Sequence, residues 1–283
     1  MPTVDFPPLS GAESENRPDY CILIHMFMAP RSALPRYAEL HCLSSFSFLL
    51  GASQPDELVG CAHALGYAAL AITDECSVAG AVRAHLAAKQ CSLNLIIGSE
   101  FALSAPSSAF PSAASKLVLL AADREGYGTL AELITACRRR AGKGSYAFSL
   151  EDVAAGVPGC LALLAPGAQI PETEAAVLAE IFRGRVWMLL ELHAGADDRS
   201  RAAAVRDCAV RHGLPLAAAG DVHMHARARR ALADTLAAIR LGTRVAEAGF
   251  ALAPNGERHL RRREQLARIY PPEALAQTLA VAE

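Results

Sequence analysis

Carboxylate and imidazole side chains lie at or just after the ends of five short apolar runs of this sequence. They are, in chain order, Glu39 and His41, Asp74 and Glu75, Glu100, Glu191 and His193, and Asp221, His223 and His225. Carboxylate oxygens and imidazole nitrogens are the ligands that Zn²⁺, Mn²⁺ and Fe²⁺ take in proteins. If the groups converge in the fold, two or three bound ions could activate a water molecule and hold a phosphate.

The spacing of Asp221 and His223 is the most informative of these. Alternate residues of an extended segment point to the same side, so both side chains could face one ion. A single histidine at a strand end is more often a hydrogen-bonded structural residue. The metal hypothesis therefore rests on the pattern that several strand ends share.

Short apolar runs alternate with amphipathic segments along the chain. The runs, which we predict to be strands, cover residues 37–43, 68–73, 93–98, 116–122, 160–165, 186–192 and 215–220. Most are apolar on both faces, which is typical of parallel strands that are buried on both sides. Predicted helices cover residues 55–65, 77–90, 124–140, 172–182, 197–212 and 226–241. This alternation predicts an α/β fold with parallel strands and right-handed crossovers.

A closed barrel of seven or eight strands fits the sequence better than an open doubly wound sheet. A nucleotide-binding open sheet would carry a Gly-rich phosphate loop after its first strand, and none is found there. The polar residues follow several different strands instead, which is where barrel enzymes place their chemistry. We expect residues 104–115, rich in Ser, Pro and Ala, to form a surface loop or hairpin tip, and residues 257–283 to form one or two further helices.

The composition of the chain limits its partners. The 283 residues are 52% hydrophobic and carry a net charge of −2, so no strong overall field recruits nucleic acid or an anionic membrane. Two basic clusters, Arg138–Arg140 and Arg261–Arg263, could contact DNA locally, but we expect both to be solvated helix faces. The eight cysteines include no CxxC pair, which indicates buried thiols in a reducing compartment. We predict a cytoplasmic protein with no membrane partner.

Four segments carry a resemblance to a known family. The segments YAELHCLSSFSFLLGAS, ALAITDECSVAGAVRAH, LIIGSEF and LPLAAAGDVHMHARARRALADTLAAIRLG resemble, in this order, the N-terminal PHP (polymerase and histidinol phosphatase) domain of bacterial C-family DNA polymerases. They are most similar to the error-prone, damage-inducible (ImuC-type) branch. The resemblance implies a distorted (βα)7 TIM-like barrel of the PHP type over residues 37–250. It further implies that residues 251–283 are helices leading toward a polymerase body. Residues 1–36 match nothing, and we expect a poorly ordered extension.

The resemblance also implies a metal-ligand set that is incomplete here. The family's His-x-His motif corresponds to His41 and Leu43, and its Thr-Asp-His motif corresponds to Thr73, Asp74 and Glu75. The candidate ligands are His41, Asp74, Glu75, Glu100, His193, Asp221 and His223, although His193 is offset from the expected position by two or three residues. Because even the loss of a group behind the ligands costs about 10–100-fold in metal affinity, we expect weakened binding of Zn²⁺, Mn²⁺ or Mg²⁺. The fold should require no metal.

The function that the resemblance implies is that of the longer enzyme. The activity of that enzyme is DNA-directed DNA polymerisation, which is a nucleotidyltransferase reaction. The resemblance places it in translesion synthesis during damage-induced mutagenesis, and so in DNA repair and replication. Because the family's palm domain lies beyond the matched region, we expect no catalytic residue for polymerisation in this chain, which would be a fragment or an N-terminal domain. We expect a structural role against the polymerase body, with DNA reached through the full-length enzyme.

Two other functions remain open. One is a metal-dependent PHP phosphoesterase, either a phosphatase or a 3′–5′ exonuclease. The other is an interaction module that docks onto accessory proteins of a mutagenesis complex. The sequence does not identify nucleic-acid-binding residues.

Overall fold

The computed structural model describes residues 34–103 and 114–283. Residues Pro35–Glu283 form one compact unit, and the following description concerns that unit alone. The prediction that residues 1–36 form a poorly ordered extension falls almost entirely outside the described residues. No helix in the described part of the chain is long and apolar enough to cross a bilayer.

The strands form a seven-stranded sheet in chain order. They are β1 (Ala38–Glu39), β2 (Ala69–Ile72), β3 (Asn94–Ala102), β4 (Lys116–Ala121), β5 (Cys160–Ala165), β6 (Val186–Glu191) and β7 (Leu216–Ala219). The segments after β1 and β7 then pair with each other: Leu43 N donates to Val222 O at 2.8 Å, and Val222 N donates to His41 O at 2.9 Å. These bonds join the first strand to the last, so the sheet closes. The predicted (βα)7 TIM-like barrel is confirmed.

The prediction that all strands run parallel is wrong for β4. This strand is antiparallel to both β3 and β5, and its pairing with β3 runs from Gly98 opposite Leu120 to Ala102 opposite Lys116. Parallel neighbours need a long crossover, whereas strands that pair immediately after the chain turns back are antiparallel. As a result, β4 begins at the end of the barrel where the parallel strands finish. The predicted hairpin tip lies mostly outside the described residues.

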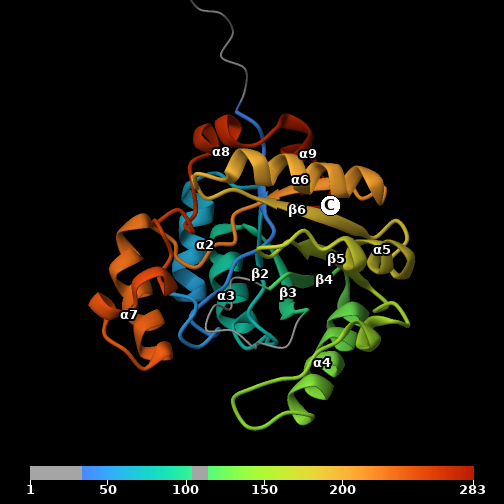
Figure 1. The fold of residues 1–283 in the computed structure, drawn as a ribbon, viewed down its shortest axis with the longest axis horizontal. Coiled ribbons are helices and arrows are strands. Elements are labelled where there is room, and N and C mark those ends of the chain that lie inside the picture. The colour runs from blue at the N-terminus through green and yellow to red at the C-terminus, as the bar shows by residue number, and fades with distance from the viewer. Residues whose placement is uncertain (1–33, 104–113) are drawn as a thin grey trace, which may run out of the picture. The chain divides into compact units, whose positions relative to one another are not determined.

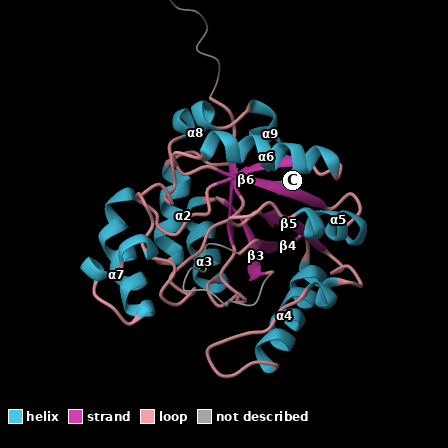
Figure 2. Ribbon diagram, in the orientation of Figure 1, coloured by secondary structure: helices cyan, strands magenta, loops and turns pink. Residues whose placement is uncertain are grey.

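Helices surround the strands (Figure 2). They are α2 (Pro55–Ala64), α3 (Ala81–Cys91), α4 (Arg124–Arg139), α5 (Glu172–Ile181), α6 (Asp198–Arg211), α7 (Arg230–Leu241), α8 (Arg263–Ile269) and α9 (Pro272–Ala282). Each of the six predicted helices is present, five between strands and one after β7, and the tail supplies α8 and α9. The seven cysteines among the described residues are all free thiols.

The inside of the barrel is filled by small and branched apolar side chains. They are Ala38, Leu40, Ala69, Ala71, Val118, Leu120, Leu163, Ala165, Leu189, Ala217 and Ala219. Helix α9 covers one end of this interior: Val281 joins the same cluster, and the Thr278 hydroxyl accepts a bond from Ala38 N at 3.2 Å. Since Ala38 begins β1, the covered end is the one opposite the carboxyl ends of the parallel strands. Residues 251–283 thus pack on the barrel, and whether they also lead toward a polymerase body stays a prediction.

The expectation of two solvated basic clusters is wrong for Arg261. Its side chain is only 2% exposed, and its guanidinium donates to Leu192 O at 2.9 Å and to the Tyr270 hydroxyl at 3.1 Å. The Tyr270 hydroxyl in turn donates to Ala219 O at 2.7 Å. Arg261 therefore links the segment before α8 to the ends of β6 and β7. It donates to the carbonyl of Leu192 directly, and it is bonded to the Tyr270 hydroxyl that donates to the carbonyl of Ala219.

The neighbouring arginine gives a matched control for this role. Replacing Arg261 with Gln should lower the free energy of unfolding by about 3 kcal/mol, because buried acceptors lose a charged donor. Replacing the exposed Arg262 with Gln should change it by less than about 0.5 kcal/mol. Urea unfolding of both variants measures the difference, and equal effects would contradict the structural role of Arg261.

Candidate functional site

His41 lies at the centre of the barrel rim, by which we mean the end of the barrel where the parallel strands finish. The side chain is fully buried, with Nδ1 at 2.6 Å from Glu191 Oε1 and Nε2 at 2.6 Å from Glu100 Oε2. An ionised carboxylate only accepts, so both ring nitrogens donate and the ring is an imidazolium. Burial lowers the pKa of His41, but the charge of Glu191 and the bonds to both carboxylates outweigh burial and raise the pKa to about 10.

Lys116 supplies a second cation from the start of β4. Its Nζ lies 2.8 Å from Glu100 Oε2 and 3.7 Å from Asp221 Oδ1. Burial raises the pKa of Glu100, but the charge of Lys116 and the bond to His41 dominate and lower it to about 2. Burial also lowers the pKa of Lys116, yet the charges of Asp221 and Glu100 keep that pKa above its usual value. Both groups are therefore ionised at neutral pH.

Arg258 supplies the third cation, from the segment before α8. Its Nη1 donates to Asp221 Oδ2 and lies 3.3 Å from His223 Nε2, which is itself 3.1 Å from Asp221 Oδ1. Burial raises the pKa of Asp221, but the charges of Arg258 and Lys116 hold it well below its usual value. Burial lowers the pKa of His223. The backbone of Asp221 has a φ of 42°, a left-handed conformation that a non-glycine residue rarely adopts, which fits a residue fixed by its surroundings.

The charged groups at the centre of the rim are paired within the protein. Three carboxylates (Glu100, Glu191 and Asp221) lie against three cations (His41, Lys116 and Arg258). A buried charge is tolerated only where it is paired and hydrogen-bonded. Here each buried carboxylate has such a partner from another part of the barrel, so the cluster holds the rim together.

The structure brings some of the predicted site residues into one cluster and gives others different hydrogen-bond partners. Donor atoms of His41, Glu100 and Asp221 lie within 4.8 Å of one another, with His223 beside Asp221. Asp74 instead accepts bonds from Ser44 N, Ser44 Oγ and Ser47 Oγ, at 2.8, 2.8 and 2.7 Å, and so fixes the loop after β1.

The remaining predicted residues are engaged elsewhere. Glu75 accepts a bond from the Tyr146 hydroxyl at 3.1 Å, and burial raises the pKa of Glu75. His193 Nε2 lies 2.9 Å from Gly220 O, and burial lowers the pKa of His193. His193 nevertheless borders a pocket of about 170 Å³ at the rim, which Lys116, Glu191, Arg201, Asp221 and Arg258 also line.

Sequence reasoning missed Lys116 and Arg258. Lys116 is the first residue of a predicted strand, and only the reversed direction of β4 places it among the carboxyl ends of the other strands. Arg258 follows no strand, and its segment reaches the rim through bonds of its carbonyl oxygen with His223 N at 3.0 Å and Met224 N at 3.2 Å. No spacing in the sequence indicates that contact.

The rim carries candidate metal-ligand groups, but their present arrangement does not fit a multinuclear metal centre. Both nitrogens of His41 are bonded to carboxylates, and Glu100 and Asp221 each hold a side-chain cation. An ion at this place would have to displace Lys116 and Arg258. Leu43, at the position where the family that the sequence resembles has a metal-ligating histidine, is fully buried and apolar.

The family model described as the PHP domain matches residues 39–170. Residues 39–170 of this chain are thus similar to PHP domains. Its relatives include proteins named error-prone DNA polymerase. The one from Dechloromonas aromatica is 52% identical over 255 residues, covering 88% of this chain and 24% of that protein. The one from Bordetella parapertussis is 53% identical over 263 residues, covering 88% of this chain and 25% of that protein.

The chain spans about a quarter of the length of these relatives. Among solved structures it is similar to an amidohydrolase from Chromobacterium violaceum, with 19% identity and a TM-score of 0.48, covering 66% of this chain and 88% of that one.

Lys116 gives the first test of the charge balance. Replacing Lys116 with Met should lower the free energy of unfolding by about 3 kcal/mol, because Glu100 loses a buried partner. In a double variant with Glu100→Gln, the two effects should differ from additivity by about 0.5–3 kcal/mol. Replacing the exposed Lys89 with Met is the control and should change stability by less than about 0.5 kcal/mol. Additive effects in urea unfolding would contradict the pairing.

The pKa of His41 predicts how stability depends on pH. The folded-state pKa of about 10 lies above the unfolded value of about 6.5, so the contribution of His41 is complete below pH 6.5 and is lost as the pH rises toward 10. A His41→Asn variant lacks this proton. Between these pH values the free energy of unfolding of the wild type should therefore fall more steeply with pH than that of the variant. The difference in slope should reach up to about 1.4 kcal/mol per pH unit. Parallel curves for the two proteins in urea unfolding would rule out an imidazolium at His41.

Proposed function

We propose that this chain is the PHP part of an error-prone DNA polymerase and that its role there is structural. The identity of about 50% to error-prone DNA polymerases over most of the chain supports the polymerase assignment. The observation that carries the structural role is the placement of Lys116 and Arg258 against the rim carboxylates. With these cations in place, the rim ties β1, β3, β4, β6 and β7 together without an ion.

The activity of the longer enzyme would be template-directed DNA synthesis across damaged bases, in damage-induced mutagenesis and repair. That chemistry requires a carboxylate cluster that holds two metal ions in a palm domain. This PHP chain would contribute stability, with DNA and mutagenesis accessory proteins reached through the full-length enzyme in the cytoplasm.

Helix α7 supports the polymerase body as the partner. Among the described parts of the chain, Ala238 is the only buried residue of this helix, while Leu232 and Ile239 are 40% and 59% exposed. Val245 and Phe250, in the turns that follow, are exposed as well. The helix lies at the edge of the unit, away from the strands (Figure 1). Exposed apolar side chains gathered in this way are typical of protein–protein interfaces.

A metal-dependent phosphoesterase is the second candidate, because donor atoms of His41, Glu100 and Asp221 do converge beside a pocket. Without an ion, however, these groups are occupied by one another and by Lys116. Purified protein should therefore show no Mn²⁺-dependent hydrolysis of a phosphomonoester or of a mismatched primer 3′ end above that of its Asp221→Ala variant. Hydrolysis that Asp221→Ala abolishes would establish the phosphoesterase instead.

A chimera tests the polymerase assignment directly. Residues 37–283 would replace the matching quarter of the error-prone DNA polymerase of Dechloromonas aromatica. The chimera should extend a primer on intact and abasic templates at a rate within about tenfold of the parent enzyme, because a domain of 52% identity should pack on the same body.

Two further variants of the chimera test whether Lys116 stabilises the transplanted domain. Introducing Lys116→Met into the chimera should lower its midpoint of thermal inactivation, whereas Lys89→Met should not. A folded chimera that cannot extend a primer would contradict the proposed function.

A further inference from the structure

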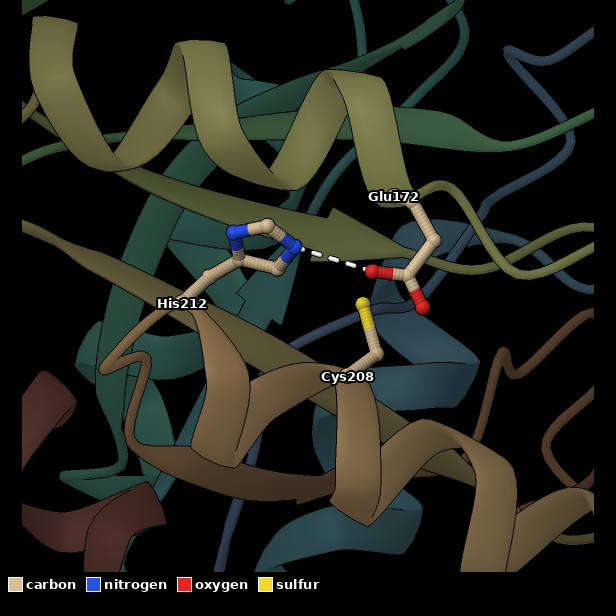
Figure 3. Close-up of side chains that lie close together, drawn as sticks. All are labelled: Glu172, Cys208 and His212. Atoms are coloured by element: carbon tan, nitrogen blue, oxygen red, sulfur yellow. Dashed lines mark hydrogen bonds and ion pairs between the residues drawn. The ribbon is translucent and has the colours of Figure 1, made fainter.

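A second group of potential metal ligands lies outside the barrel, on the helix layer. It consists of Glu172 in the first turn of α5 and of Cys208 and His212 at the end of α6. Figure 3 shows the three side chains pointing toward one another. One ligand atom from each lies within 4.8 Å of the others, and none of the three belongs to the rim.

The local structure explains why these groups meet. Cys208 and His212 are four residues apart, and His212 N donates to Cys208 O at 3.1 Å, so the helical turn continues through both. Residues at this spacing lie on the same helix face. Glu172 reaches them from the neighbouring helix, with its Oε2 at 2.9 Å from His212 Nε2. Two helices thus present a thiol, an imidazole and a carboxylate to one point.

We propose that Glu172, Cys208 and His212 bind a single Zn²⁺ ion that joins α5 to α6. A thiolate, an imidazole and a carboxylate form a donor set that favours Zn²⁺ over Mg²⁺, Ca²⁺ or Mn²⁺. Ligands of a tetrahedral zinc ion at bond lengths of about 2.0–2.3 Å are about 3.3–3.8 Å apart. The carboxylate oxygen and the imidazole nitrogen need to separate by only a few tenths of an ångström to reach that spacing.

Burial and exposure define the rest of the coordination. Cys208 is fully buried, whereas the Glu172 side chain is 46% exposed, so the thiol lies beneath the carboxylate and water can reach the fourth position from outside. Arg211 donates to Glu172 Oε1 and thereby competes with a cation at this place. Because the bond to Arg211 uses Oε1, the other oxygen faces His212, and an ion would take the place of the bond between Oε2 and His212 Nε2.

A titration with Co²⁺ tests this site directly. The metal-free 283-residue protein would be titrated with Co²⁺, whose near-ultraviolet charge-transfer absorption reports a thiolate ligand, and then with Zn²⁺ in competition with a chromophoric chelator. The proposal expects one Co²⁺ per chain with a thiolate band, and displacement of that ion by Zn²⁺. The band should be absent in Cys208→Ser and present in the control Cys91→Ser, whose thiol lies on α3.

A change to the partly exposed ligand His212 guards against a folding defect in Cys208→Ser. His212→Gln should lower Zn²⁺ affinity by at least about 100-fold, since losing a ligand costs more than losing a group behind it. Replacing the exposed His85 with Gln should leave the affinity unchanged, and Arg211→Ala should raise it. The absence of a thiolate band in wild type, or its persistence in Cys208→Ser, would overturn the proposal and leave Glu172 as an ordinary ion-pair partner of Arg211 and His212.

Discussion

The imidazolium of His41, held between Glu191 and Glu100, is the interaction on which the rim of this barrel depends. Its side chain is inaccessible to water, and both of its nitrogens are bonded at 2.6 Å. Two carboxylates around one buried cation leave an excess of negative charge. Asp221, which lies nearby, adds to that excess. That excess must be compensated within the protein or by bound ions. In this chain Lys116 and Arg258 compensate it.

The backbone arrangement follows from the same requirement. Lys116 can reach Glu100 because β4 runs against its neighbours and starts at the rim. Arg258 reaches Asp221 because its own carbonyl oxygen is bonded to the segment after β7. The cluster therefore joins the first, third, fourth, sixth and seventh strands near the place where β1 and β7 close the barrel. A side-chain ammonium and a guanidinium perform the electrostatic role that metal ions could perform between such carboxylates.

The sequence predicted the elements well and the site only in part. Apolar runs located each strand, because strands buried on both faces leave a continuous signal. The rule that strand ends share a rim brought His41, Glu100 and Asp221 together. The direction of β4 was not predictable from its run, because a parallel and an antiparallel buried strand have the same composition. The partners of Asp74 were not predictable for a different reason: two serines after β1 donate to its carboxylate, and nothing in the sequence indicates that contact.

The protonation and ligation of His41 test the central claim most directly. Nitrogen-15 NMR of the histidine side chains at pH 8, without and with excess Zn²⁺, would identify the His41 signals by their loss in a His41→Gln variant. If protein cations balance the rim, both nitrogens of His41 will be protonated and their signals will not change when Zn²⁺ is added. A neutral ring at pH 8 would contradict the imidazolium, and a nitrogen that loses its proton and shifts on adding Zn²⁺ would show a rim that binds metal. Either result would contradict the structural role.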